Sequence, residues 1–130
     1  MELGIVHILP TDITPQVILD PEGFIMIRGR SQTLNTTNFP TQITDWIDEY
    51  LYNPAESTKV NIEFEYINSY GTKILISFLQ KISEVIVQNK KLIIHWYFDE
   101  DDDDILERGQ YISEALNIPF KFIMINSSRD

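Results

Sequence analysis

Apolar residues recur along the 130-residue chain with two different spacings, and the spacing changes several times between its ends. Alternation of apolar and polar residues is typical of strands, whereas apolar residues three and four positions apart are typical of helices. The pattern therefore divides the chain into strand-like and helix-like segments before composition or motifs are considered.

Five short segments are typical of β-strands. They are "PQVILD" (15–20), "GFIMIRG" (23–29), "TKVNIEFEYI" (58–67), "KLIIHWYF" (91–98) and "FKFIMI" (120–125). The turn residues 20–23 between the first two predict a hairpin. The third segment alternates, which predicts one buried side consisting of Val60, Ile62, Phe64 and Tyr66. The fourth is apolar on both sides at its start, which indicates a central strand.

Three longer segments are typical of amphipathic helices. After a polar loop from Ser31 to Asn38, the first helix is expected to begin near Asn38 or Phe39, with Pro40 in its first turn. The second is expected from Thr72 to Val87. The third covers 102–116 and should bury Ile105, Tyr111, Ile112 and Leu116.

The order of these segments is β-β-α-β-α-β-α-β. Strands that alternate with helices predict an α/β fold with right-handed crossovers. We therefore expect a mixed, largely parallel β-sheet with about three helices. No repeat, linker or change of composition divides the chain, so a single domain over residues 1–130 is expected.

Composition narrows the function classes. The net charge is −10 and should repel phosphates, so neither nucleic acid nor an anionic membrane surface is an expected partner. The chain has no cysteine, which excludes disulfides and thiolate chemistry. No apolar run reaches the roughly 18 residues of a membrane span. The acidic N-terminal start does not resemble a secretory signal, so a cytoplasmic protein is expected.

The segment "NSYGT" (68–72) lies between a predicted strand and a predicted helix and carries hydroxyls at Ser69, Tyr70 and Thr72. Open α/β sheets place their functional sites at such strand ends. A hydroxyl at a helix start can be phosphorylated, because the helix N-terminus tolerates negative charge. The alternative is that Asn68 or Ser69 only caps the helix. From the turn alone, capping is the favoured interpretation.

Other candidates for chemistry are weaker. The acidic run 99–104 lacks the glycine turn of a calcium loop and is better interpreted as a solvated entry to the third helix, so no metal site is expected. His95 lies within a predicted strand and is expected to be packed rather than catalytic. There is no Gly-x-Ser-x-Gly elbow and no glycine-rich phosphate loop, and no cofactor is expected. A small hydrolase with an unrecognised carboxylate pair remains an alternative interpretation of the function.

Two stretches together resemble a known family. They are "EYINSYGTKILISFLQKI" and "KKLIIHWYFDEDDDDILERGQYISEALNIPFKFI", which include Glu107-Arg108-Gly109 and Ile118-Pro119-Phe120. In this order they are similar to the SiaC-type regulatory phosphoproteins. The segments "ITPQVILD", "IRGRS" and "ITDWIDEYL" are also similar, so the resemblance covers nearly the whole chain.

The resemblance implies a STAS-like fold and a switch protein, not an enzyme. In this family a protein kinase phosphorylates a hydroxyl in the strand-helix turn, and a metal-dependent Ser/Thr phosphatase removes the phosphate. The unphosphorylated form binds and activates an effector such as a diguanylate cyclase, which promotes biofilm. An alternative is a STAS-like anti-sigma-factor antagonist, an interaction module with a different partner.

The family's phosphorylated threonine corresponds by resemblance to Ser69, with Thr72 as the alternative acceptor. The residues expected to support the turn and its phosphate are Asn68, Tyr70, Gly71, Thr72 and Lys73.

Overall fold

The computed structural model describes residues 3–32 and 41–126. The strands are β1 (Val6–Ile8), β2 (Gln16–Asp20), β3 (Phe24–Ser31), β4 (Ser57–Ile67), β5 (Lys91–Asp99) and β6 (Lys121–Ile125). The helices are α1 (Thr41–Tyr50), α2 (Ser69–Ile82), α3 (Glu84–Val87) and α4 (Asp103–Leu116). The expected α/β class with a mixed, largely parallel sheet is confirmed, and the arrangement is compatible with a STAS-like fold.

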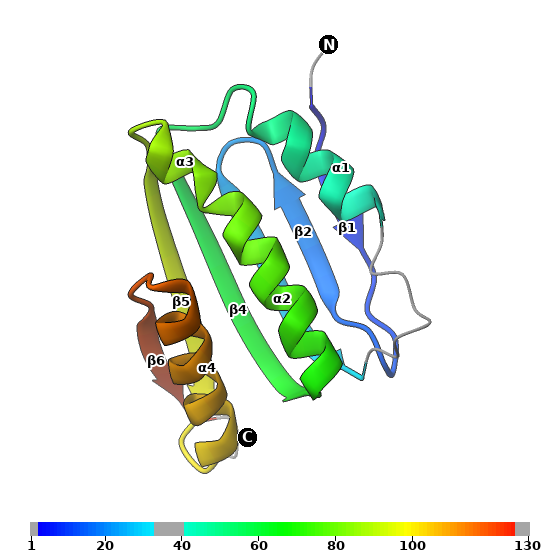
Figure 1. The fold of residues 1–130 in the computed structure, drawn as a ribbon. Helices are drawn as coiled ribbons and strands as arrows, with labels where there is room; N and C mark the ends of the chain where they lie inside the picture. Colours follow the sequence, from blue (N-terminus) through cyan, green and yellow to red (C-terminus); the bar gives the residue numbers. More distant parts are fainter. Residues whose placement is uncertain (1–2, 33–40, 127–130) are drawn as a thin grey trace.

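Within the described residues, the strands form one sheet of six in the order β1-β2-β3-β4-β5-β6. The pairs β1–β2 and β2–β3 are antiparallel, and the pairs from β3 to β6 are parallel. Because each parallel connection steps in the same direction and crossovers are right-handed, their helices must pack on the same face of the sheet. Figure 1 shows α1, α2 and α4 together on that face. The carboxyl ends of β4 and β5 consequently lie beside the start of α2 and of α4.

The hydrophobic core lies between this face and the helices. Helix α2 contributes Leu75, Phe78, Leu79 and Ile82, and α4 contributes Ile105 and Ile112. The Trp96 ring of β5 is fully buried, and its Nε1 donates a hydrogen bond to the Ile105 carbonyl oxygen at 3.0 Å. This bond ties the first turn of α4 to the sheet.

Several boundaries differ from the sequence predictions. Strand β1 was not predicted, since it has only 3 residues. The predicted second helix starts at Ser69 instead of Thr72 and is interrupted at Ser83, so it forms two helices. Ser31 belongs to β3 rather than to the predicted loop. The predicted start of the first helix, near Asn38 to Pro40, lies outside the described residues.

Two aromatic residues expected in the core are exposed. A β-bulge places the Arg30–Tyr66 pair next to the Gly29–Phe64 pair, so Glu65 is an extra residue in β4. The extra residue reverses the alternation, and Tyr66 is 43% exposed while Ile67 is buried. Tyr111 of α4 is 60% exposed, because the buried stripe of this helix runs through Gly109 instead.

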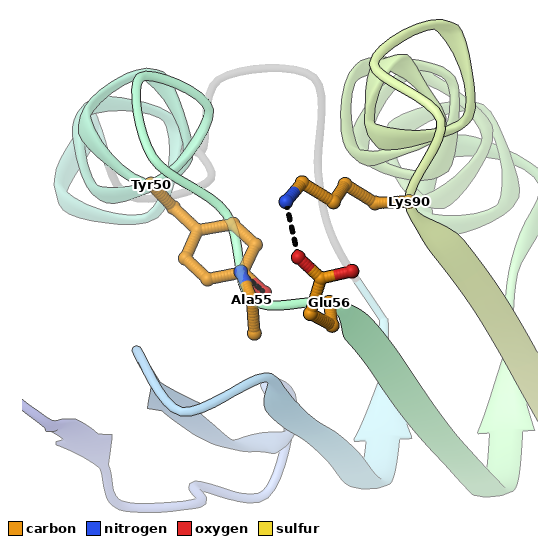
Figure 2. A network of polar contacts seen from close by, with 4 residues as sticks. All are labelled: Tyr50, Ala55, Glu56 and Lys90. Atoms are coloured by element: carbon orange, nitrogen blue, oxygen red, sulfur yellow. Dashed lines mark hydrogen bonds and ion pairs between the residues drawn. The ribbon is translucent and has the colours of Figure 1, made fainter.

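Polar contacts hold the amino end of β4, where the chain enters this strand from α1 (Figure 2). The Tyr50 hydroxyl shares a hydrogen bond of 2.7 Å with the buried Thr58 hydroxyl and accepts one of 3.2 Å from the Ala55 N–H. Lys90 pairs with Glu56 at 2.6 Å and lowers the pKa of that carboxyl. These contacts fix the end of the sheet that is far from the Ser69 turn.

Candidate functional site

A cleft of 690 Å³ opens at the carboxyl edge of the sheet, between the end of β4, the first turns of α2 and the exposed side of α4. It is lined by Glu65, Tyr66, Ile67, Ser69, Thr72, Lys73, Ile76, Asp102, Asp104, Ile105, Glu107, Arg108 and Tyr111. The structure therefore brings the predicted turn together with α4, about 35 residues further along the chain.

Asn68 caps helix α2. Its backbone is extended, and its side-chain oxygen accepts a hydrogen bond of 2.8 Å from the Gly71 N–H. Capping is thus performed by Asn68, which leaves Ser69 as the first helical residue. The Ser69 side chain is exposed in the cleft, and its hydroxyl makes no hydrogen bond to any residue that the structure describes.

Thr72 differs from Ser69 in both burial and bonding. It is only 4% exposed. Its hydroxyl donates to the Asn68 carbonyl oxygen at 2.9 Å and accepts a hydrogen bond of 3.1 Å from Arg108 Nη1. A hydroxyl with both roles occupied and almost no exposure is a structural group, and an enzyme could reach it only if the turn opened.

Gly71 is required by close packing. A Cβ at this position would lie 2.5 Å from the Ser31 Oγ and 3.2 Å from the Asn68 Oδ1. The first turn of α2 therefore sits directly against the end of β3, which fixes the direction in which Ser69 faces the cleft. Tyr70 is half-buried on the same turn.

Lys73 is exposed and lines two hollows. One is the cleft beside Ser69, and the other is a groove of 500 Å³ between α1 and α2. Because Lys73 lies four residues after Ser69, the two side chains are on the same side of the helix. A charge added at Ser69 would therefore lie near Lys73 within the cleft.

Most charges at the mouth of the cleft are negative. Asp102 is the N-cap of α4 and accepts a hydrogen bond of 3.0 Å from the Ile105 N–H, and two further acids, Asp103 and Asp104, lie in the first turn. The acidic run is thus a helix entry, as predicted. Within residues 3–32 and 41–126, no group of three or more His, Asp or Glu side chains is arranged to hold a metal ion.

Arg108 was not identified as a site residue from the sequence. It lies in the "ERG" motif, where Gly109 lets α4 approach the Trp96 ring: a Cβ on Gly109 would lie 2.5 Å from Trp96 Cε2. This close contact directs the preceding residue, Arg108, toward α2. The motif was visible in the sequence, but the hydrogen bond to Thr72, 36 residues away, was not.

His95 lies on the face of the sheet opposite the helices and away from the cleft. It is half-buried and makes an edge contact with Tyr97, with ring centroids 6.3 Å apart. Burial lowers the pKa of His95, and the positive charges of Lys59 and Lys121 lower it further. The expectation that His95 is packed agrees with this position.

Comparison with known proteins identifies the protein family to which the chain belongs. A family model for regulatory phosphoproteins matches residues 8–125, which is most of the chain. The chain therefore belongs to the SiaC family of regulatory phosphoproteins. The predicted resemblance is confirmed, and the chain is a regulatory protein and not an enzyme.

Solved structures share the fold. The apo-SiaC structure from Pseudomonas aeruginosa superposes with a TM-score of 0.80 at 21% identity, covering 92% of this chain and 98% of that one. SiaC in complex with the diguanylate cyclase SiaD, which it activates, superposes with a TM-score of 0.81 at 21% identity, covering 92% and 99%. An uncharacterized protein of P. aeruginosa strain UCBPP-PA14 is 22% identical over 115 residues, covering 88% of this chain and 91% of that protein.

No helix in the described part of the chain has the length and apolar character needed to cross a membrane.

Proposed function

We propose that this protein is a signalling switch controlled by reversible phosphorylation of Ser69. The observation that carries the proposal is the division of roles in the turn. Asn68 caps the helix and Thr72 is buried and bonded, whereas the Ser69 hydroxyl is exposed in the cleft. Of the two acceptors suggested by the sequence, Ser69 is therefore the one that a kinase can reach without unfolding the turn.

The switch acts through charge. A phosphate adds about −1.5 to −2 charges at neutral pH. In the unphosphorylated form, the cleft and the first turn of α2 are available to a partner. In the phosphorylated form, a partner would have to desolvate the phosphate beside the acids Glu65 and Glu107, which line the same cleft. Phosphorylation should therefore weaken binding.

The partners follow from the family. A protein kinase and a metal-dependent Ser/Thr phosphatase would set the state of Ser69 in the cytoplasm. The effector would be a diguanylate cyclase, and support comes from the likeness in fold to the SiaC that activates SiaD. The small hydrolase with an unrecognised carboxylate pair was the other alternative, and membership of a regulatory family argues against it.

The experiment compares Ser69→Ala and Ser69→Asp in binding to a diguanylate cyclase from the same host, measured by calorimetry. Ser69→Ala should bind like the native protein, and Ser69→Asp should bind at least about tenfold more weakly, a loss of about 1.4 kcal/mol. Ser57→Asp is the matched control, because Ser57 is exposed at the other end of β4. Equal binding of both Ser69 variants would refute the proposal.

The modification itself is tested on protein purified from its host. Fragment mass spectrometry should find phosphate on Ser69 in part of the population. Phosphate on no residue of the turn, under conditions that change the host's cyclic dinucleotide level, would contradict a phosphorylation switch. Recovery of an anti-sigma kinase in place of a cyclase would support the antagonist alternative.

A further inference from the structure

We propose that Arg108 is the receptor for the phosphate on Ser69, so that phosphorylation adds a charged contact between the first turn of α2 and α4. This inference rests on the phosphorylation part of the proposed function. It concerns a residue on a different helix, and it adds a defined geometry to the phosphorylated state.

The Arg108 guanidinium is already held close to the acceptor. Its Nη1 donates a hydrogen bond of 3.1 Å to the Thr72 Oγ1. Thr72 lies three residues after Ser69, and side chains with this spacing are neighbours on a helix surface, with Cβ atoms about 5–6 Å apart. Arg108 and Ser69 also line the same cleft. A phosphate on Ser69 therefore lies within reach of the guanidinium.

Arg108 has unused binding capacity. The ion pairs among the described residues join Arg28 to Glu63, Lys81 to Asp48 and Lys90 to Glu56, and none includes Arg108. A guanidinium offers five N–H donors in a planar fork. The single bond to a neutral hydroxyl uses one of them. Several donors therefore remain for a phosphate.

It is favourable for Arg108 to exchange its hydrogen bond to the Thr72 hydroxyl for hydrogen bonds to the phosphate. A guanidinium and a phosphate carry opposite charges and frequently form two parallel N–H···O bonds, which a neutral hydroxyl cannot offer. Thr72 gives up only an accepted bond, because its own O–H continues to donate to the Asn68 carbonyl oxygen. No buried donor is left without a partner. The helix cap at Asn68 also stays intact.

The other charges around Ser69 favour the same position. Lys73 lies one turn further along α2, and a negative group four residues before a lysine is the favourable order on a helix. The first helical position is also favourable for negative charge. In contrast, the carboxylates of Glu65, Asp104 and Glu107 line the cleft and repel the phosphate. Without Arg108, the phosphate would turn toward solvent.

The test uses protein in which phosphate is placed on Ser69 during synthesis, so neither the kinase nor the partner is needed. Phosphorus NMR gives the second pKa of the phosphate directly; its ordinary value is about 6. In the native background this pKa should be lowered. Arg108→Gln should raise it by about 0.5–1, as expected for loss of one nearby cation at a partly exposed site.

Two variants provide matched controls. Arg28→Gln removes the same charge from an exposed arginine that pairs with Glu63, and it should leave the titration unchanged. Arg30→Gln removes a different cation near the cleft, because the Arg30 guanidinium lies 5.5 Å from the ring of Tyr66, which lines the cleft. This variant should shift the phosphate pKa less than Arg108→Gln does. Arg108→Lys keeps the charge without the fork and should give an intermediate pKa. Thermal unfolding of each variant without phosphate verifies that it folds.

The proposal is overturned if Arg108→Gln titrates like the native protein, or if Arg30→Gln shifts the pKa as much as Arg108→Gln does. Phosphorylation should also raise the unfolding temperature of the native chain, and this gain should disappear in Arg108→Gln. If the Arg108→Gln titration fails in this way, the comparison of Ser69→Ala and Ser69→Asp in partner binding still tests the switch independently. Conversely, absence of phosphate in the host would refute the switch without changing the titration.

Discussion

Replacement of Gly109 by alanine should destabilise the protein, although alanine is the better helix former. Gly109 is buried in the middle of α4 against Trp96. A Cβ there would lie 2.5 Å from both Cε2 and Nε1 of the indole and 2.7 Å from Cδ1. The ring cannot move freely, because Trp96 is fully buried and stacks on Phe120 with centroids 6.1 Å apart.

The expected magnitude follows from three contributions. Alanine in place of glycine stabilises a helix interior by about 1 kcal/mol. Forcing an extra methyl group into a packed core costs about 1–3 kcal/mol. Displacing the indole also weakens the bond from Trp96 Nε1 to the Ile105 carbonyl oxygen, at about 1 kcal/mol. The net loss is about 1–3 kcal/mol, which lowers Tm by roughly 4–12 °C for a domain of this size.

Urea unfolding followed by tryptophan fluorescence measures this loss. Gln110→Ala, at the next and exposed position of α4, is the control and should change stability by less than about 0.5 kcal/mol. In a Trp96→Phe background, which lacks the clashing indole atoms, Gly109→Ala should cost at least about 1 kcal/mol less. A Gly109→Ala protein as stable as the native chain would refute the reasoning.

Three further outcomes are expected from the fold. Asn68→Ala should lower stability by about 1 kcal/mol in urea unfolding, because the helix loses its cap, whereas Asn68→Asp should retain most of it. Tyr50→Phe should cost about 1–3 kcal/mol in the same assay, because it leaves the buried Thr58 hydroxyl without that partner. The pKa of His95 lies below its ordinary value of 6.5, so its stabilising contribution is complete above that pH and is lost as the pH falls through the folded-state pKa. Native protein should therefore lose more stability than His95→Gln between about pH 7.5 and about pH 5.

Each of these expectations has a clear contrary result. An Asn68→Ala protein that unfolds at the native urea concentration would show that the cap is dispensable. Equal stability of Tyr50→Phe would mean that the Thr58 hydroxyl finds another acceptor. Parallel pH profiles for native protein and His95→Gln would show that the imidazole does not titrate differently on folding.

Sequence patterning was sufficient for the class of fold, because apolar stripes mark the longer helices, and short alternating or continuous apolar runs mark the longer strands. It failed at particular residues for identifiable reasons. Tyr66 fits the alternation of its strand, but a single extra residue, Glu65, reverses the pattern. Tyr111 fits a helical stripe, but Gly109 turns that stripe toward Trp96. Bulges and close glycine contacts depend on neighbouring elements, so one segment read alone does not show them.

The sequence by itself determined the order of the longer strands and helices, the acidic charge and the position of the hydroxyl-bearing turn at a strand end. Those properties follow from local periodicity and composition. The sequence did not show β1 or the break between α2 and α3. The tertiary structure decided which hydroxyl is exposed, since Asn68 takes the cap and Thr72 is buried by contacts with other elements. It also brought Arg108 to the turn across 36 residues of chain. Such contacts are set by right-handed crossovers and by close packing on the sheet, which no local pattern encodes.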